Sequence, residues 1–393
     1  MWRADPDARR IIGAQGLRAV GYGCTSVLLG TLLAAYGYSP LATGALLAVT
    51  VAGTAAAALV IGRLADSWGR RRCYLVINVG FVCAGVTVAV APSILTVVLV
   101  AATGLLSTDV VDNGPATTLE QPMLAGADAR VAGKSGARIY GLYNMVASLA
   151  GALGALTAAV PSVLGAPDTA TWPFLILVPV GSIGAWLASR LTPNVEVAPT
   201  TNTPGVLCPS KARVHRLAAL FAVDAAGGGL VTSSFLAYYL TTRYGASTEL
   251  LGVLFFCTAL LQAVSVWVAP RLADRIGLVP TMVATHLPSN VLLAALAFAP
   301  SLVVAVPLLL ARASLSQMDV PTRQALVMQT VTPPERTAAA AETNAARYTI
   351  RPAGTMLGGV LQHLAVGLPL LVAGIVKGGY DIALWIWVRR TQP

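Results

Sequence analysis

The residues best able to do chemistry in this chain are ionisable side chains inside long apolar segments. Such groups are costly to place in a membrane, and they usually mark the path of a substrate, an ion or a proton. Asp109 and Asp112 are three residues apart, which places both carboxylates on one face of a helix. The full set of candidate transport or coupling residues is Arg18, Asp109, Asp112, Asp224, Asp319, Arg323, Asn344 and Arg351.

Two oppositely charged couples are spaced so that they can pair on their own helix. Asp319 and Arg323 are four residues apart, and so are Lys377 and Asp381. We expect Lys377 and Asp381 to form a structural pair near a helix end. Asp319 and Arg323 are kept as candidates for function.

Arg18, by contrast, needs a partner from another helix, because an unpaired buried charge is very unfavourable. We expect this partner to be Asp112 or Asp224. These two aspartates are also the favoured proton-coupling groups. Two interpretations stay open: salt bridges that open and close during a conformational cycle, or direct binding of substrate and protons.

Further polar residues on predicted helices are candidates for contact with a ligand. Tyr143 and Asn144 are the substrate-contact candidates. Pro352 follows Arg351 and frees a backbone carbonyl, which can kink the helix there. The three histidines are isolated in the sequence and the five cysteines form no metal-ligand pair, so neither a metal nor a cofactor is predicted.

The segments that must position these residues are apolar enough to require lipid as their solvent. Hydrophobic residues make up 56% of the chain and charged residues 11%, against roughly 25% charged in soluble domains. A spanning helix needs about 20 apolar residues. Twelve such segments are predicted, at 11–36, 42–62, 73–92, 94–117, 139–162, 171–190, 216–241, 248–269, 279–299, 302–323, 340–364 and 367–388.

Basic residues alternate between the loops of this predicted topology. With the first residues on the inner side, Lys and Arg gather in the inner loops and only Arg243 falls in an outer loop. This asymmetry predicts that both termini are cytoplasmic. It also explains the net charge of +10 without a nucleic-acid partner.

The two halves of the chain resemble each other. The motif Gly62-Arg-Leu-Ala-Asp-Ser-Trp-Gly69 recurs 208 residues later as Pro270-Arg-Leu-Ala-Asp-Arg-Ile-Gly277. A polar stretch rich in Pro and Thr separates the copies. We therefore predict an N-terminal six-helix bundle at 1–190, a cytoplasmic linker at 191–215 and a C-terminal six-helix bundle at 216–393. A parallel repeat of this kind places a substrate site where the halves meet.

The first copy of the motif, continued by Arg70-Arg71-Arg72, resembles the signature loop of the major facilitator superfamily, Gly-x-Leu-Ala-Asp-x-x-Gly-Arg-(Lys/Arg)-(Lys/Arg). The chain is similar to poorly characterised bacterial members. The resemblance implies an all-α membrane fold of twelve helices in two pseudo-symmetric bundles. It also implies a gating loop that holds the inner ends together, formed by Gly62, Asp66, Gly69, Arg70, Arg71, Asp274 and Gly277.

These observations predict a secondary active transporter that works by alternating access and is not an enzyme. Arg18, Arg323 and Arg351 would suit an anionic or zwitterionic small organic solute, and the aspartates would suit coupling to a proton gradient. We expect a monomer in contact with membrane lipid, multi-pass in a bacterial inner (plasma) membrane.

Three alternatives are kept. Proton-coupled efflux of drugs or toxic compounds is the first, although the fifth predicted helix lacks the Gly-Pro pair typical of such antiporters. The second is a membrane-embedded enzyme that uses Asp109 and Asp112 to hold Mg²⁺. A transporter-like receptor is the third, and it usually carries an additional soluble domain.

Overall fold

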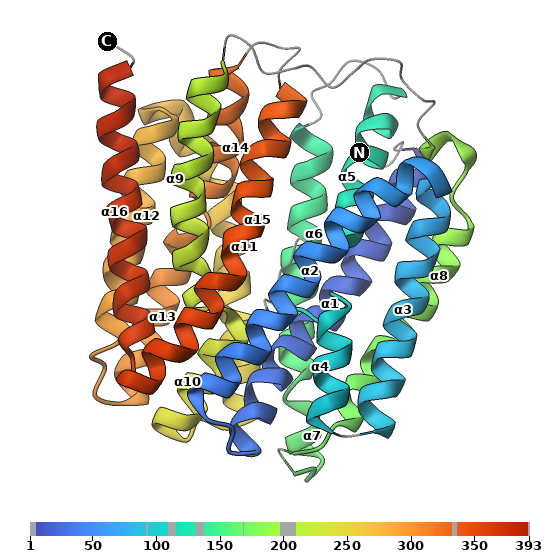
Figure 1. Cartoon of the computed structure of the whole chain (residues 1–393), viewed down its shortest axis with the longest axis vertical. Coiled ribbons are helices and arrows are strands. Elements are labelled where there is room, and N and C mark those ends of the chain that lie inside the picture. The colour runs from blue at the N-terminus through green and yellow to red at the C-terminus, as the bar shows by residue number, and fades with distance from the viewer. Residues whose placement is uncertain are drawn as a thin grey trace. The chain divides into compact units, whose positions relative to one another are not determined.

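The fold is that of a computed structural model, which describes residues 5–91, 93–108, 115–130, 137–167, 169–196, 210–331 and 336–391. Within these ranges the chain forms helices joined by turns, and no strand occurs (Figure 1). The long helices consist mainly of Ala, Leu, Val and Gly. The small residues among them, Ala and Gly, allow helices to approach closely in lipid, where packing rather than the hydrophobic effect holds the helices together.

The first half of the chain contains eight α-helices and two short 3₁₀ helices among its described residues. They are α1 (Pro6–Ala35), α2 (Pro40–Trp68), α3 (Arg70–Val90), α4 (Ile94–Ala102), α5 (Pro115–Arg130), α6 (Ala137–Thr157), α7 (Val160–Val163), η1 (Trp172–Ile176), α8 (Leu177–Ser189) and η2 (Pro193–Val195).

The second half contains eight further helices in its described part. They are α9 (Lys211–Leu230), α10 (Ser233–Tyr244), α11 (Thr248–Ile276), α12 (Leu278–Leu296), α13 (Leu302–Ser316), α14 (Asp319–Thr330), α15 (Arg336–Leu364) and α16 (Leu368–Thr391).

Ten helical stretches of the described residues are long and apolar enough to cross a membrane. They correspond to ten of the twelve predicted spans. The other two predicted spans are 94–117, which is interrupted between α4 and α5, and 340–364, which corresponds to the more polar α15. The predicted helical membrane fold is therefore confirmed, while the side on which the termini lie stays a prediction.

The fourth span of each half is broken. In the first half α4 ends at Ala102, the described chain to Thr108 is not helical, and α5 begins at Pro115. The corresponding span of the second half breaks between α13 and α14, just before Asp319. Broken membrane helices occur where non-helical backbone faces a site rather than lipid. Each second segment carries a buried acid, Glu120 on α5 and Asp319 on α14.

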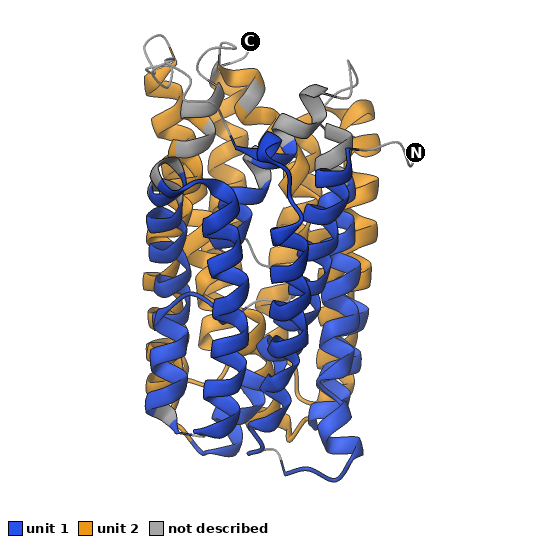
Figure 2. Ribbon diagram, turned by 90° about the vertical axis from the view of Figure 1, so that its right-hand side faces the viewer, with its two compact units in different colours: residues 1–37, 49–200, 247–259 blue, residues 38–48, 201–246, 260–393 orange. Residues whose placement is uncertain are grey.

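The described helices form two compact units (Figure 2). Unit 1 contains residues 1–37, 49–200 and 247–259, and unit 2 contains residues 38–48, 201–246 and 260–393. The first turns of α2 thus belong to unit 2, and the first turns of α11 belong to unit 1. The boundary between the units is more complex than one cut in the sequence. The predicted linker at 191–215 stays a prediction, because most of it lies outside the described residues.

Inside each unit the first and fifth spans touch through glycines. In unit 1, a Cβ added at Gly154 on α6 would lie 2.1 Å from the carbonyl oxygen of Val20 on α1. In unit 2, a Cβ added at Gly354 on α15 would lie 2.2 Å from the carbonyl oxygen of Ala226 on α9. Only glycine permits such backbone contact, so these positions set the distance between the two helices in each unit.

The repeated motif forms a turn of one residue in both halves. Gly69, with φ of 88°, separates α2 from α3, and Gly277, with φ of 93°, separates α11 from α12. Positive φ favours glycine because a side chain would clash with the backbone. Gly62, the first residue of the motif, lies inside α2, which continues to Trp68. The gating loop predicted from the resemblance is therefore formed mostly by the ends of helices, such as the last turns of α2 and α11.

The Gly154 contact yields a stability prediction. Replacing Gly154 by Ala forces a methyl group into the backbone of α1, and overpacking of this kind costs about 1–3 kcal/mol. We expect the G154A protein to unfold several degrees below the wild type in detergent, as followed by thermal unfolding. Gly13→Ala is the matched control, because its added Cβ lies 3.8 Å from Leu187 Cδ1, an ordinary contact. Equal unfolding temperatures for the two variants would contradict this account of the α1–α6 contact.

Candidate functional site

Each unit contains a buried network of charged and polar side chains. In unit 1 the network is centred on Glu120 and draws residues from α1, α3, α5 and α6. In unit 2 it is centred on Asp224 and draws residues from α9, α12, α14 and α16. Both lie among apolar helices, where every unpaired charge is costly. The two networks are therefore the candidate functional sites.

The network in unit 1 surrounds one carboxylate with four donors. Arg18 binds Glu120 in a bidentate manner, with Nη1 2.7 Å from Oε1 and Nη2 2.6 Å from Oε2. The Tyr74 hydroxyl donates to Oε1 at 2.5 Å, and the Tyr143 hydroxyl donates to Oε2 at 2.6 Å. Gln15 accepts a further bond from Arg18. All of these side chains are buried, and the Glu120 side chain is fully enclosed.

This geometry corrects the expected partner of Arg18. Arg18 pairs with Glu120, whereas Asp224 pairs within unit 2, and Asp112 lies outside the described residues. Sequence reasoning missed Glu120 because the fourth span was predicted to end at residue 117. The polar run Thr117 to Gln121 resembles a loop. The signal that was available is the buried Arg18, which required an acid from some other helix.

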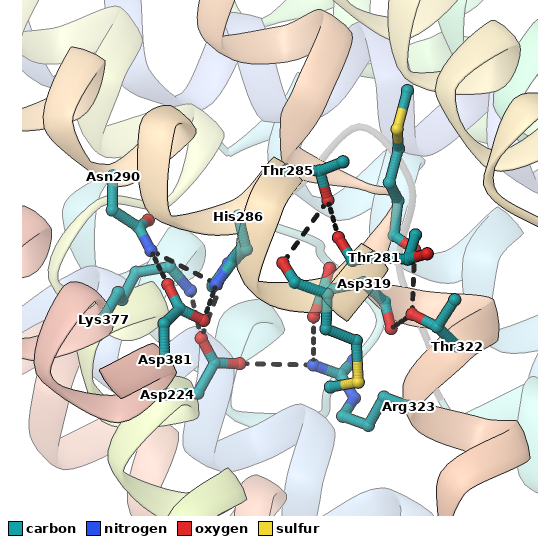
Figure 3. A network of polar contacts seen from close by, with 12 residues as sticks. Asp224, Thr281, Thr285, His286, Asn290, Asp319, Thr322, Arg323, Lys377 and Asp381 are labelled. Atoms are coloured by element: carbon teal, nitrogen blue, oxygen red, sulfur yellow. Dashed lines mark hydrogen bonds and ion pairs between the residues drawn. The ribbon is translucent and has the colours of Figure 1, made fainter. Parts of the chain in front are cut away.

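The network in unit 2 is centred on Asp224 of α9 (Figure 3). Its Oδ1 lies 2.5 Å from Lys377 Nζ on α16, and its Oδ2 lies 3.3 Å from Arg323 Nη1 on α14. Asp319 also binds this Arg323 nitrogen at 2.7 Å, which is the i,i+4 pair predicted from spacing. Gly227 gives Lys377 room, because an added Cβ there would lie 2.6 Å from Lys377 Cγ.

A second carboxylate extends this network through a histidine. Asp381 of α16 lies 2.8 Å from His286 Nδ1 and accepts a bond from Asn290 Nδ2 at 2.9 Å. The other ring nitrogen of His286 is 3.8 Å from Asp224 Oδ1, so the imidazole lies between two carboxylates (Figure 3). His286, described above as isolated in the sequence, is thus part of the site. It was missed because His286 and Asp381 are 95 residues apart.

The expected structural pair of Lys377 and Asp381 is wrong. Lys377 binds Asp224 and Asp381 binds His286, and both side chains are buried in the middle of α16 rather than near its end. Spacing of four residues permits a pair on one helix, but stronger contacts to neighbouring helices prevail here. The i,i+4 rule therefore succeeds for Asp319 and fails for Asp381.

Two half-buried arginines of the second half have nitrogens that lack a partner among the described residues. The Nε–H groups of Arg347 on α15 and Arg312 on α13 are buried and donate to no acceptor among the described residues. Arg347 lies within electrostatic range of Asp224, Asp319 and Arg323. Its Nε–H is therefore a donor beside the Asp224 network that is available for a further acceptor.

The remaining predicted residues lie in less enclosed places. Asn144 and Arg351 are half-buried, and Asn344 is exposed. Tyr143, predicted to contact substrate, donates its hydroxyl to Glu120. Asp109 lies outside the described residues, as does Asp112. In the described chain, no group of three His, Cys, Asp or Glu side chains is arranged to hold a metal ion.

The segment predicted to act as a gating loop is bound by an acid that the sequence analysis did not select. Glu196, just after η2, accepts the backbone N–H of Arg70 at 2.7 Å and that of Arg71 at 3.1 Å. The first N–H groups of a helix have no acceptor within the helix itself, and a negative charge is favoured there. Asp274 in the second copy is exposed, and the side chain of Asp66 lies outside what the structure describes.

Comparison with known proteins places the chain in a family. The model of the Major Facilitator Superfamily matches residues 11–359, and the chain belongs to this superfamily. An uncharacterized membrane protein of Saccharomyces cerevisiae, YJR124C, is 23% identical over 400 residues, which cover 92% of this chain and 89% of the yeast protein. The resemblance noted at the Gly62–Arg72 motif is thereby confirmed.

Solved structures of transporters share the fold. The nucleoside transporter NupG matches with a TM-score of 0.71 at 12% identity, over 98% of this chain and 99% of its own. The xylose transporter XylE from E. coli gives 0.73 at 14%, over 98% and 96%. The human organic anion transporter MFSD10 gives 0.65 at 17%, over 97% and 100%. The chain is a multi-pass membrane transporter and not an enzyme.

The pairing of Lys377 can be tested by double-mutant cycles. Residues in direct contact show interaction energies of about 0.5–3 kcal/mol. We expect a larger coupling energy between K377M and D224N than between K377M and D381N, because only Asp224 contacts the ammonium group directly. Thermal or chemical unfolding of the purified single and double variants measures both cycles. A larger coupling for Asp381 would restore the pair expected from spacing.

Proposed function

We propose that this protein is a secondary transporter of a small organic solute that carries a negative charge, either an anion or a zwitterion. The solute moves together with protons or in exchange for them. Membership of the superfamily supports secondary transport as the class of activity. The charge of the solute and the coupling ion rest on the two buried networks. The solute is expected to bind as the chain alternates between conformations that open to opposite sides.

The proposed negative charge of the solute is inferred from Arg347. In unit 2, Arg323 and Lys377 are occupied by Asp224 and Asp319, whereas the buried Nε–H of Arg347 has no acceptor among the described residues. A buried donor without an acceptor costs about 1–3 kcal/mol. A carboxylate, sulfonate or phosphate oxygen of a solute would supply that acceptor. The fold shared with an organic anion transporter is consistent with this choice.

Proton coupling is supported by the number of buried carboxylates. Glu120, Asp224, Asp319 and Asp381 are all enclosed by apolar helices. Protonation of any one of them removes a charge and weakens the ion pairs that join its helix to neighbouring helices. In unit 2 the charged and titratable groups that face these acids are Arg323, Lys377, Arg347, His286 and Tyr380.

A single chain is proposed as the working unit, since each network is complete within one copy of the chain. A membrane that maintains a proton gradient is the required setting, and a plasma membrane provides one. The direction of net solute movement follows from the direction of the proton gradient.

The proposal is tested in proteoliposomes with an imposed pH gradient. A panel of labelled organic anions, amino acids, nucleosides, D-xylose and organic cations is offered in parallel. We expect accumulation of negatively charged or zwitterionic members, and its loss on addition of a protonophore. Movement of neutral or cationic members alone would contradict the proposed class of solute, and accumulation that ignores the protonophore would contradict proton coupling.

A series of variants tests whether Arg347 binds the negatively charged group of the solute. Arg347→Gln removes the charge, so we expect the KM for the transported anion to rise about tenfold or more, in line with the loss of one charged hydrogen bond. Arg347→Lys keeps the charge and should restore part of the affinity. Arg243→Gln, at an exposed position, is the matched control. If R347Q and R243Q have the same KM, Arg347 does not bind the solute.

A further inference from the structure

The donors around Glu120 are positioned as a receptor for a carboxylate. Both oxygens of Glu120 accept two bonds each, one from Arg18 and one from a tyrosine hydroxyl, with all four distances between 2.5 and 2.7 Å. Bidentate binding by Arg is the geometry that proteins use to recognise carboxylates. The two tyrosines add the second donor that each oxygen can accept. This set satisfies a carboxylate more completely than a simple ion pair does.

The helices that supply the donors differ from the helix that supplies the carboxylate. Arg18 is on α1, Tyr74 on α3 and Tyr143 on α6, while Glu120 is on α5. Gln15 of α1 binds Arg18, and Tyr74 and Tyr143 belong to an apolar core to which α1, α3, α5 and α6 all contribute. The three donors thus come from helices other than α5, and the carboxylate that they bind is carried on α5.

We propose that this cage, formed by Arg18, Tyr74 and Tyr143, is a binding site for the carboxylate group of the transported solute, and that Glu120 occupies it as an internal substitute in the absence of solute. This inference rests on the proposed transport of a negatively charged solute and names the chemical class as carboxylates. It also assigns a site in unit 1, in addition to Arg347 in unit 2.

Replacement of Glu120 by a solute carboxylate is linked to the uptake of one proton, because the net charge of the cage has to stay balanced. When a solute carboxylate replaces Glu120, the displaced side chain takes up one proton, so that a single negative charge still faces Arg18. Without that charge the guanidinium would be buried and unpaired, which is very unfavourable. The titratable groups that face the Arg18–Glu120 pair are Tyr22 from α1, Tyr74 from α3 and Tyr143 from α6, while η2 has none. Carboxylate binding is therefore expected to strengthen as the pH falls.

The break before α5 gives the occupant a way to leave. The described residues from Gly104 to Thr108 are not helical, so α5 can shift without bending a continuous helix. In this structure Glu120 is completely enclosed and Arg18 is 2% exposed, so the cage is closed around its internal occupant. Exchange thus requires movement of the segment that carries Glu120.

The receptor can be tested by removing its occupant. The Glu120→Ala protein should be stabilised by acetate and propionate, with a saturable rise of several degrees in its unfolding temperature. Chloride and sulfate at the same ionic strength should not do this, because they do not match the planar bidentate geometry. The wild type should show a much smaller rise at neutral pH, because Glu120 competes with the added carboxylate for the same donors. The double variant R18Q/E120A should lose the response to acetate.

The same experiment defines the results that would overturn the proposal. An E120A protein that ignores acetate, or that responds equally to chloride, has no carboxylate receptor and only a structural ion pair. A response that persists in R18Q/E120A would place acetate elsewhere. Stabilisation of E120A by acetate supports the receptor even if no panel solute is moved by the wild type, a result that would count against the transport proposal alone.

A second variant tests the proposal even if the E120A protein does not fold. Glu120→Gln keeps the shape of the side chain and mimics its protonated form. We expect E120Q in proteoliposomes to move carboxylates down their own gradient, with a KM that no longer changes when the pH is lowered from neutral to mildly acidic. If E120Q keeps the pH dependence of the wild type, Glu120 does not exchange with the solute.

Discussion

The structure depends on the neutralisation of charges that lie among apolar helices. Lipid offers no solvation for a carboxylate or a guanidinium, so pairing with an opposite charge on the same or a neighbouring helix is strongly favoured. Arg18 with Glu120 and Asp224 with Lys377 and Arg323 meet this requirement. Because their partners come from several helices, these pairs also fix which helices pack together. Packing and function are therefore constrained by the same side chains.

The two units solve this requirement in similar ways. In each, the fourth span is interrupted, and the segment after the break carries an acid that pairs with an arginine: Glu120 with Arg18 of α1 in unit 1, and Asp319 with Arg323 of the same segment in unit 2. The units differ in what surrounds the acid. Tyrosine hydroxyls complete the shell in unit 1, whereas Lys377, His286 and Asn290 extend the network in unit 2. A duplicated architecture thus carries two chemically different interiors.

Sequence reasoning predicted what depends on local pattern. Apolar length gave the spans, the repeated motif gave the duplication with Gly69 and Gly277 at equivalent turns, and spacing of four residues gave the Asp319–Arg323 pair. Contacts between helices were not accessible in this way. The partner of Arg18 was misassigned because Glu120 lies beyond a break that apolar length does not reveal. The same limit hid the pairing of Lys377 with Asp224, which are 153 residues apart.

The division of α2 and α11 between the units has a consequence for biosynthesis. Unit 1 includes residues 247–259, so it is incomplete until well over half of the chain has left the ribosome. Unit 2 includes residues 38–48, which are inserted into the membrane long before the rest of that unit exists. Neither half of the sequence, produced alone, contains a whole unit. Final packing must therefore follow insertion of the late helices, and the early spans have to remain soluble in lipid as incompletely packed helices until then.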